Sequence, residues 1–105
     1  MSPPSLAASS SSKQDILQNL RTKNVDRIVI GNLNVNSIVS KFDELKILVK
    51  DKVDILILTE TKLDESFPAA QFNIEGYKSP YRQDINRNGG GVLIYARDDI
   101  IWNVP

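Results

Sequence analysis

Cysteine and histidine are both absent from this sequence of 105 residues. Without cysteine there is no disulfide framework and no thiolate metal site. Without histidine the chain lacks the side chain that most often acts as a general base, which is also a common metal ligand. Any metal bound by this chain would therefore be a hard cation held by oxygen atoms.

The sequence also lacks an excess of charge and a long apolar run. Its 13 basic residues balance its 13 acidic ones, so the net charge does not indicate a nucleic-acid partner, although local patches can still bind one. No apolar run approaches the roughly 18 residues of a membrane span, and the N-terminus does not resemble a signal peptide. We therefore expect an intracellular protein without a membrane partner, located in the nucleus if it acts on chromosomal DNA.

The first part of the chain differs in composition from the rest. Serine, proline and alanine dominate residues 1–12, and such a segment buries too little apolar surface to offset the entropy of ordering. Further on, Ile16, Leu17 and Leu20 would share one face of a short helix. We predict that residues 1–26 form a disordered or weakly helical tail and that order begins near Arg27.

Residues 28–59 combine two strand patterns with one helical pattern. Residues 28–33 have the composition of a buried strand, and the apolar run of residues 53–59 is typical of a strand covered on both faces. Between them, the sequence Ser40-Lys41-Phe42-Asp43 resembles a capping box, and an apolar stripe has helical spacing: Ile38, Phe42, Leu45 and Val49. Strand, helix and strand form a βαβ unit, whose two strands are parallel.

Polar residues follow both predicted strands. Asn34 and Asn36 follow the first strand, and Glu60 follows the second. Because parallel strands end at the same edge of a sheet, we expect these residues to lie close together. A glutamate there can hold Mg²⁺, and an asparagine can orient a phosphate without adding negative charge. Polar residues at strand ends are also ordinary, and residue types alone favour that explanation over a metal site.

Glycines and arginines form the remaining candidates. The run Gly89-Gly90-Gly91 after Asn88 predicts a turn before a strand at residues 92–96, and it is not a P-loop because no Gly-Lys-Ser/Thr follows. Arg82 and Arg87 could contact a DNA backbone. Ordinary surface arginines explain them equally well.

Three strings, taken together and in order, resemble the N-terminal part of the endonuclease/exonuclease/phosphatase superfamily. They are LNVNSI at residues 33–38, VDILILTETKLDESFP at 53–68 and NGGGVLIYAR at 88–97. Within the superfamily, they resemble the apurinic-like endonuclease domains of non-LTR (LINE-type) retrotransposons. The resemblance implies that residues 27–105 form the N-terminal portion of a DNase I-like α/β sandwich, an incomplete domain.

The resemblance also implies roles for individual residues. Asn34 matches the family's active-site asparagine, Glu60 matches its Mg²⁺-binding glutamate, and Asn36 matches a position near the metal that is often Asp or Asn. The implied reaction is Mg²⁺-dependent hydrolysis of a phosphodiester bond in DNA. In a retrotransposon this reaction nicks the target, and the freed 3′ hydroxyl primes reverse transcription.

The sequence lacks the motifs that make up the second half of the family's pattern. The family also uses a later tyrosine, a D-x-N pair and an S-D-H motif, whereas this sequence contains no histidine. Loss of residues that act together in catalysis greatly lowers the rate, so we expect the isolated chain to be inactive as a nuclease. Two alternatives stay open. One is a non-catalytic fragment that binds a partner or self-associates through an uncovered sheet edge, and the other is a different phosphoesterase of the superfamily.

Overall fold

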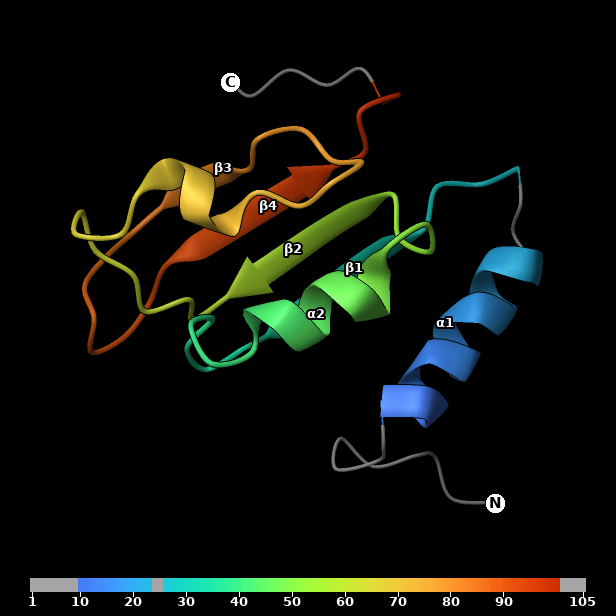
Figure 1. Cartoon of the computed structure of the whole chain (residues 1–105), viewed down its shortest axis with the longest axis horizontal. Coiled ribbons are helices and arrows are strands. Elements are labelled where there is room, and N and C mark those ends of the chain that lie inside the picture. Colours follow the sequence, from blue (N-terminus) through green and yellow to red (C-terminus); the bar gives the residue numbers. More distant parts are fainter. Residues whose placement is uncertain (1–9, 24–25, 101–105) are drawn as a thin grey trace.

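The computed structural model describes residues 10–23 and 26–100. Its elements are α1 (Ser10–Lys23), β1 (Ile30–Asn34), α2 (Phe42–Val49), β2 (Ile55–Thr59), the 3₁₀ helix η1 (Ala69–Phe72), β3 (Tyr81–Gln83) and β4 (Val92–Ala96). Four strands form one sheet in the order β1-β2-β4-β3 (Figure 1). The pair β1 and β2 is parallel and joined through α2, while β4 runs antiparallel to both β2 and β3. The predicted α/β class and the βαβ unit are confirmed.

Helix α2 covers one face of the sheet with the predicted apolar stripe. Its buried residues include Phe42, Leu45 and Val49, and Ile38 just before the helix is fully buried. The predicted capping box is wrong, because Lys41 occupies the N-cap position and caps no backbone N–H with its side chain. A turn precedes the helix, in which the Lys41 N–H donates to the Ile38 carbonyl at 3.0 Å. Ser40 lies within this turn, one residue too early to cap.

The first strand begins later than predicted. It spans Ile30–Asn34 instead of residues 28–33, and Ile28 lies outside it with 61% of its surface exposed. At the other end the strand includes Asn34, which pairs in register with Thr59 at the end of β2. The sequence pattern could not fix these bounds because strand ends depend on where the partner strand stops.

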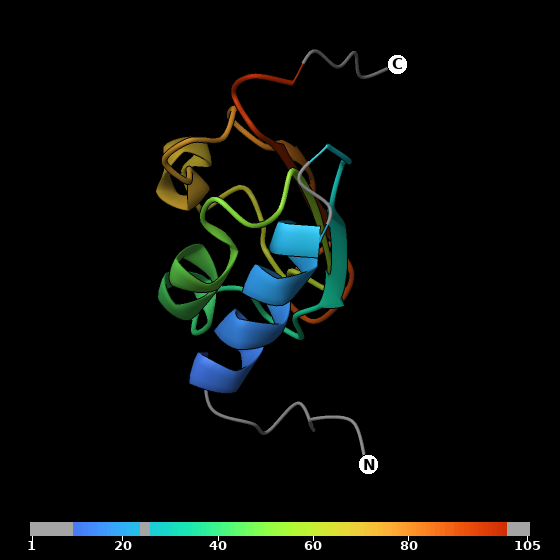
Figure 2. The ribbon, with the colours of Figure 1, turned by 90° about the vertical axis from the view of Figure 1, so that its right-hand side faces the viewer.

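Only one face of the sheet is covered by the described residues. Figure 2 shows α2 and η1 on one side of the sheet and no layer on the other. In β2, Leu56 and Leu58 are buried whereas Ile55 and Ile57 are partly exposed. On the same uncovered side, Ile30 is 59% exposed. The prediction that residues 53–59 are covered on both faces is therefore wrong within the described part of the chain, because the helices there supply a single layer.

The N-terminal segment contains a helix that contacts the rest of the chain. Of the two predicted alternatives, a disordered or a helical tail, α1 corresponds to the helical one, while residues 1–9 lie outside the described residues. Its Leu17 packs against the hydrophobic core, and the Arg21 guanidinium donates to the carbonyl of Lys52. Order thus begins before Arg27, the predicted start, because these contacts dock the helix. The division of the chain into parts at residue 27 stays a prediction.

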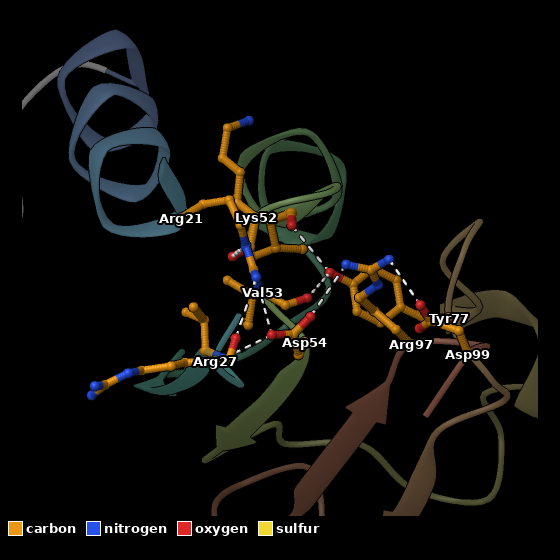
Figure 3. A network of polar contacts seen from close by, with 10 residues as sticks. Arg21, Arg27, Lys52, Val53, Asp54, Tyr77, Arg97 and Asp99 are labelled. Carbon is orange, nitrogen blue, oxygen red and sulfur yellow. Dashed lines mark hydrogen bonds and ion pairs between the residues drawn. The ribbon is translucent and has the colours of Figure 1, made fainter. Parts of the chain in front are cut away.

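A buried carboxylate joins α1 to the sheet (Figure 3). Asp54 accepts hydrogen bonds from Arg21 Nη2 at 2.5 Å, from the Val29 N–H at 2.7 Å and from Arg97 Nη1 at 3.2 Å. Burial raises the pKa of Asp54, but the hydrogen bonds from Arg21 and Val29 and the charges of both arginines outweigh it and hold the pKa below its ordinary value. This ionised aspartate therefore fixes the start of β2 against two other segments.

Candidate functional site

Three loop segments meet at the carboxyl edge of the two parallel strands. They are residues 35–38 after β1, residues 60–62 after β2 and residues 89–91 before β4. The backbone hydrogen bonds between them are Ser37 N–H to Glu60 O (2.8 Å), Ile38 N–H to Thr61 O (3.1 Å), Lys62 N–H to Gly90 O (3.0 Å) and Thr61 N–H to Gly91 O (3.5 Å). The structure thus brings Asn34, Asn36 and Glu60 to one edge of the sheet.

The central segment has a strained backbone. Glu60 and Lys62 both have a left-handed conformation, with φ of 58° and 57°, which costs roughly 1–2 kcal/mol per non-glycine residue. Thr61 between them is fully buried and acts as the inward anchor of the segment. Such strain persists only where surrounding contacts impose it, and it concentrates at functional sites.

The carboxylate of Glu60 is held by the glycine loop. Its Oε2 atom accepts a hydrogen bond from the Gly90 N–H at 2.8 Å. A side chain at Gly89 would begin only 3.9 Å from the same oxygen. Within residues 10–23 and 26–100, no hydrogen bond reaches the other oxygen, Oε1. One oxygen thus fixes the carboxylate, and the other remains a possible ligand for a cation.

The two asparagines are engaged differently. Asn34 Oδ1 accepts the Asn36 N–H at 3.1 Å and so closes a local turn. Asn36 Oδ1 accepts a hydrogen bond from the ammonium group of Lys62 at 2.5 Å. A second ammonium group, that of Lys41, donates to the carbonyls of Val35 and Asn36. Neither lysine is among the site residues predicted from the sequence, although Lys62 lies only two residues after Glu60.

These residues fit the implied Mg²⁺ in part. A single carboxylate is enough, because this ion commonly uses one or two carboxylates and completes its shell with water and substrate phosphate. Glu60 fits this role. Asn36 does not fit in the observed geometry, because its oxygen already accepts a bond from the positive Lys62. The part of the chain that the structure describes contains no group of three or more acidic or histidine side chains placed to hold a metal.

Arg82, a predicted DNA contact, has structural partners. Its side chain is 17% exposed and forms an ion pair with Asp84 at 2.8 Å. It also donates to the carbonyls of Asp64 and Phe67, at 2.7 and 2.9 Å. These bonds tie the loop after β2 to β3. The geometry gives Arg82 a structural role, and its predicted contact with DNA stays a prediction.

Arg87 is more accessible. Its side chain is 65% exposed and lies 3.9 Å from the Asp64 carboxylate, with the guanidinium 5.5 Å from the centre of the Phe67 ring. An exposed ion pair of this length contributes little to stability. The predicted DNA contact of Arg87 also remains untested.

No protein-family model and no curated protein matches the chain. Among solved structures, it matches the 3′-5′ exonuclease NExo from Neisseria meningitidis with 33% identity and a TM-score of 0.53, over 65% of this chain and 27% of that one. It also matches a structure of the 3′ phosphatase NExo from Neisseria bound to a product DNA hairpin, with 31% identity and a TM-score of 0.57, over 75% of this chain and 32% of that one.

These matches bear on the fold of the chain. The chain has the α/β fold of the DNase I-like superfamily, and its likeness is to nuclease and phosphatase enzymes that process DNA. It spans about a third or less of the length of these two structures. Neither of them is a retrotransposon endonuclease, so the resemblance is supported at the level of the superfamily. Among the described residues, no helix has the length and apolar character to cross a membrane.

Proposed function

We propose that this chain forms part of a Mg²⁺-dependent phosphoesterase that hydrolyses phosphodiester bonds in DNA. The observation that carries this proposal is the position of the Glu60 carboxylate and the Asn34 amide at one edge of a DNase I-like sheet. Both matched structures are of enzymes, and one of them is bound to a DNA hairpin. They support DNA as the substrate.

Each residue has a distinct role in the proposal. Glu60 holds the metal, which polarises the phosphate and stabilises the leaving oxygen when bound. Asn34 has its Oδ1 occupied by the Asn36 N–H, so its NH₂ group is the part that donates to a phosphate oxygen. A neutral donor suits this position because a second carboxylate would repel the phosphate.

We assign the reaction more narrowly to target nicking by a non-LTR retrotransposon endonuclease. The support is the order of the strings LNVNSI, VDILILTETKLDESFP and NGGGVLIYAR. A second candidate is removal of a 3′ phosphate, which the phosphatase description of one matched structure favours. Two substrates distinguish these reactions for any active form of the protein. Nicking is tested with an uncut duplex, and phosphate removal with a hairpin that carries a 3′ phosphate.

The isolated 105-residue chain is expected to bind metal and DNA without cutting. It has no histidine to complete an acid/base set, and loss of one member of a catalytic unit removes most of its rate. Plasmid nicking in Mg²⁺ by the purified chain, abolished by Glu60→Ala, would contradict this expectation. Such a result would at the same time support the proposed chemistry.

Two binding measurements test the proposal on the chain itself. Mn²⁺, a paramagnetic substitute for Mg²⁺, should broaden the NMR signals of Glu60 and Gly90, and Glu60→Gln should abolish the effect. Fluorescence anisotropy should show salt-dependent binding to a DNA hairpin. If neither occurs and the chain only self-associates, the non-catalytic alternative is correct.

A further inference from the structure

We propose that Lys62 is the residue that anchors a substrate phosphate at this site, and that its charge is available because its partner is the neutral Asn36. This inference rests on the proposed function, since it names a residue that would bind the phosphate group of the DNA. Lys62 lies within the string VDILILTETKLDESFP, but it is not among the assigned site residues.

The position of Lys62 is fixed by its neighbours. Its N–H donates to the Gly90 carbonyl at 3.0 Å, and its ammonium group donates to Asn36 Oδ1 at 2.5 Å. The buried Thr61 precedes it, and its own backbone is left-handed. A lysine side chain normally loses about 2 kcal/mol of conformational entropy when it is immobilised. Here the protein has already ordered part of it, which favours binding of an anion.

The charge of Lys62 is not neutralised by its partner. Asn36 accepts a hydrogen bond but carries no charge. The ion pairs formed within the described residues do not include Lys62, whereas Arg21, Arg82 and Arg97 each pair with an aspartate. A cation held in place without a counter-ion attracts an anion.

Glu60 and Lys62 carry opposite charges at the same edge without pairing. The Glu60 carboxylate is held by the Gly90 N–H, and the Lys62 ammonium is held by Asn36. One side chain is therefore available for a cation and the other for an anion. A DNA phosphate that also ligates the metal at Glu60 would have Lys62 as its second positive contact.

The nearby Lys41 is a less suitable anchor. Its ammonium group donates to the carbonyls of Val35 and Asn36, and it immediately precedes α2. These bonds tie the loop after β1 to the start of the helix. Lys41 therefore stabilises the conformation of the loop after β1. The ammonium group of Lys62 contacts that loop only through the side-chain amide of Asn36.

The test is the salt dependence of DNA binding by the full 105-residue chain. A fluorescent DNA hairpin is titrated at several salt concentrations, with Lys62→Gln, Lys62→Arg and native protein. One lost phosphate contact should reduce the slope of log K against log salt by about 0.9 in Lys62→Gln, and Lys62→Arg should restore it. Lys50→Gln, a change at an exposed lysine after the far end of α2, is the control and should leave the slope unchanged.

Asn36→Asp provides an independent variant. It places a carboxylate against the Lys62 ammonium, so the slope should fall as in Lys62→Gln while thermal stability is kept or raised. If Lys62 only supports the loop, Lys62→Gln will lower the melting temperature and leave the slope unchanged. That result, or an unchanged slope in Asn36→Asp, overturns the inference.

Inorganic phosphate separates the two proposals. In the native chain it should shift the NMR signal of the Lys62 amide, and Lys62→Gln should abolish saturable binding there. Phosphate binding at Lys62 without any binding of DNA contradicts the proposed function alone. DNA binding without a phosphate response at Lys62 contradicts only the inference, and the absence of both contradicts both.

Discussion

Gly91 and Thr61 are in such close contact that a Cβ atom on the glycine would lie 2.3 Å from Thr61 Oγ1. Thr61 is fully buried, and within the described chain its hydroxyl is the buried side-chain atom without a hydrogen-bond partner. The glycine loop therefore packs directly on the anchor of the segment that carries Glu60 and Lys62. Contact between these two residues sets the distance between two loops of the candidate site.

Gly91→Ala should destabilise the protein by about 2–4 kcal/mol. Its φ of 99° is strained for any side chain, and the added methyl group clashes with Thr61. Gly76→Ala is the matched control, because its φ is 88° and nothing lies within 4 Å of the added atom. Chemical denaturation should show a loss of only about 1–2 kcal/mol for Gly76→Ala. Equal losses in both variants would mean that the contact with Thr61 is unimportant.

Stability should fall in acid through Asp54. Its folded pKa lies below the ordinary value of 3.8, so its contribution is present above that pH and is lost as the pH falls through the folded pKa. Asp54→Asn should reduce the free energy of unfolding by about 1.5–3 kcal/mol at neutral pH, because hydrogen bonds to charged groups are lost. It should also flatten the acid limb of the curve of unfolding free energy against pH. Asp99→Asn is the control, because its ion pair with Arg97 is exposed. An acid limb unchanged in Asp54→Asn would exclude this carboxylate as its source.

The hydroxyl of Tyr77 should lose its proton at a higher pH than an exposed tyrosine. Burial raises its pKa to about 12, and its hydroxyl donates to the carbonyls of Val49 and Val53. Because the folded pKa exceeds the ordinary value of 10.0, the contribution of Tyr77 to stability is lost as the pH rises from 10 through 12.

Ultraviolet titration of the phenolate should detect this step, and Tyr77→Phe should remove it. The variant should also lose about 1–3 kcal/mol of stability, because the buried hydrogen bonds of the hydroxyl to the Val49 and Val53 carbonyls are lost. A spectrum unchanged by Tyr77→Phe would show that another tyrosine produces the late step.

The uncovered sheet face should make the isolated chain self-associate. Ile30 is 59% exposed on this face, and β1 is an edge strand, a combination that favours association between copies. Ile30→Lys should shift the chain toward monomer in analytical ultracentrifugation with little effect on stability. Leu58→Lys, on the buried face of β2, should unfold it. Monomer at all concentrations of the native chain would contradict this prediction.

Local sequence patterns are enough to predict the βαβ unit. The four-three-four spacing of Ile38, Phe42, Leu45 and Val49 places these side chains on one face of a helix in any context. The apolar run after it has the composition of a strand. A helical crossover of this length joins parallel strands, which brings the residues after both strands to one edge.

Other features depend on contacts between residues that are far apart in the sequence. Helix α1 is docked by Arg21 on Asp54, 33 residues away, and no local pattern indicates that partner. Arg82 donates hydrogen bonds to carbonyls 15 and 18 residues away, and its residue type gives no sign of these structural partners. The link from Lys62 to Asn36 spans 26 residues. Local spacing fixes which residues share an element, whereas pairing between distant side chains follows only from how the elements pack.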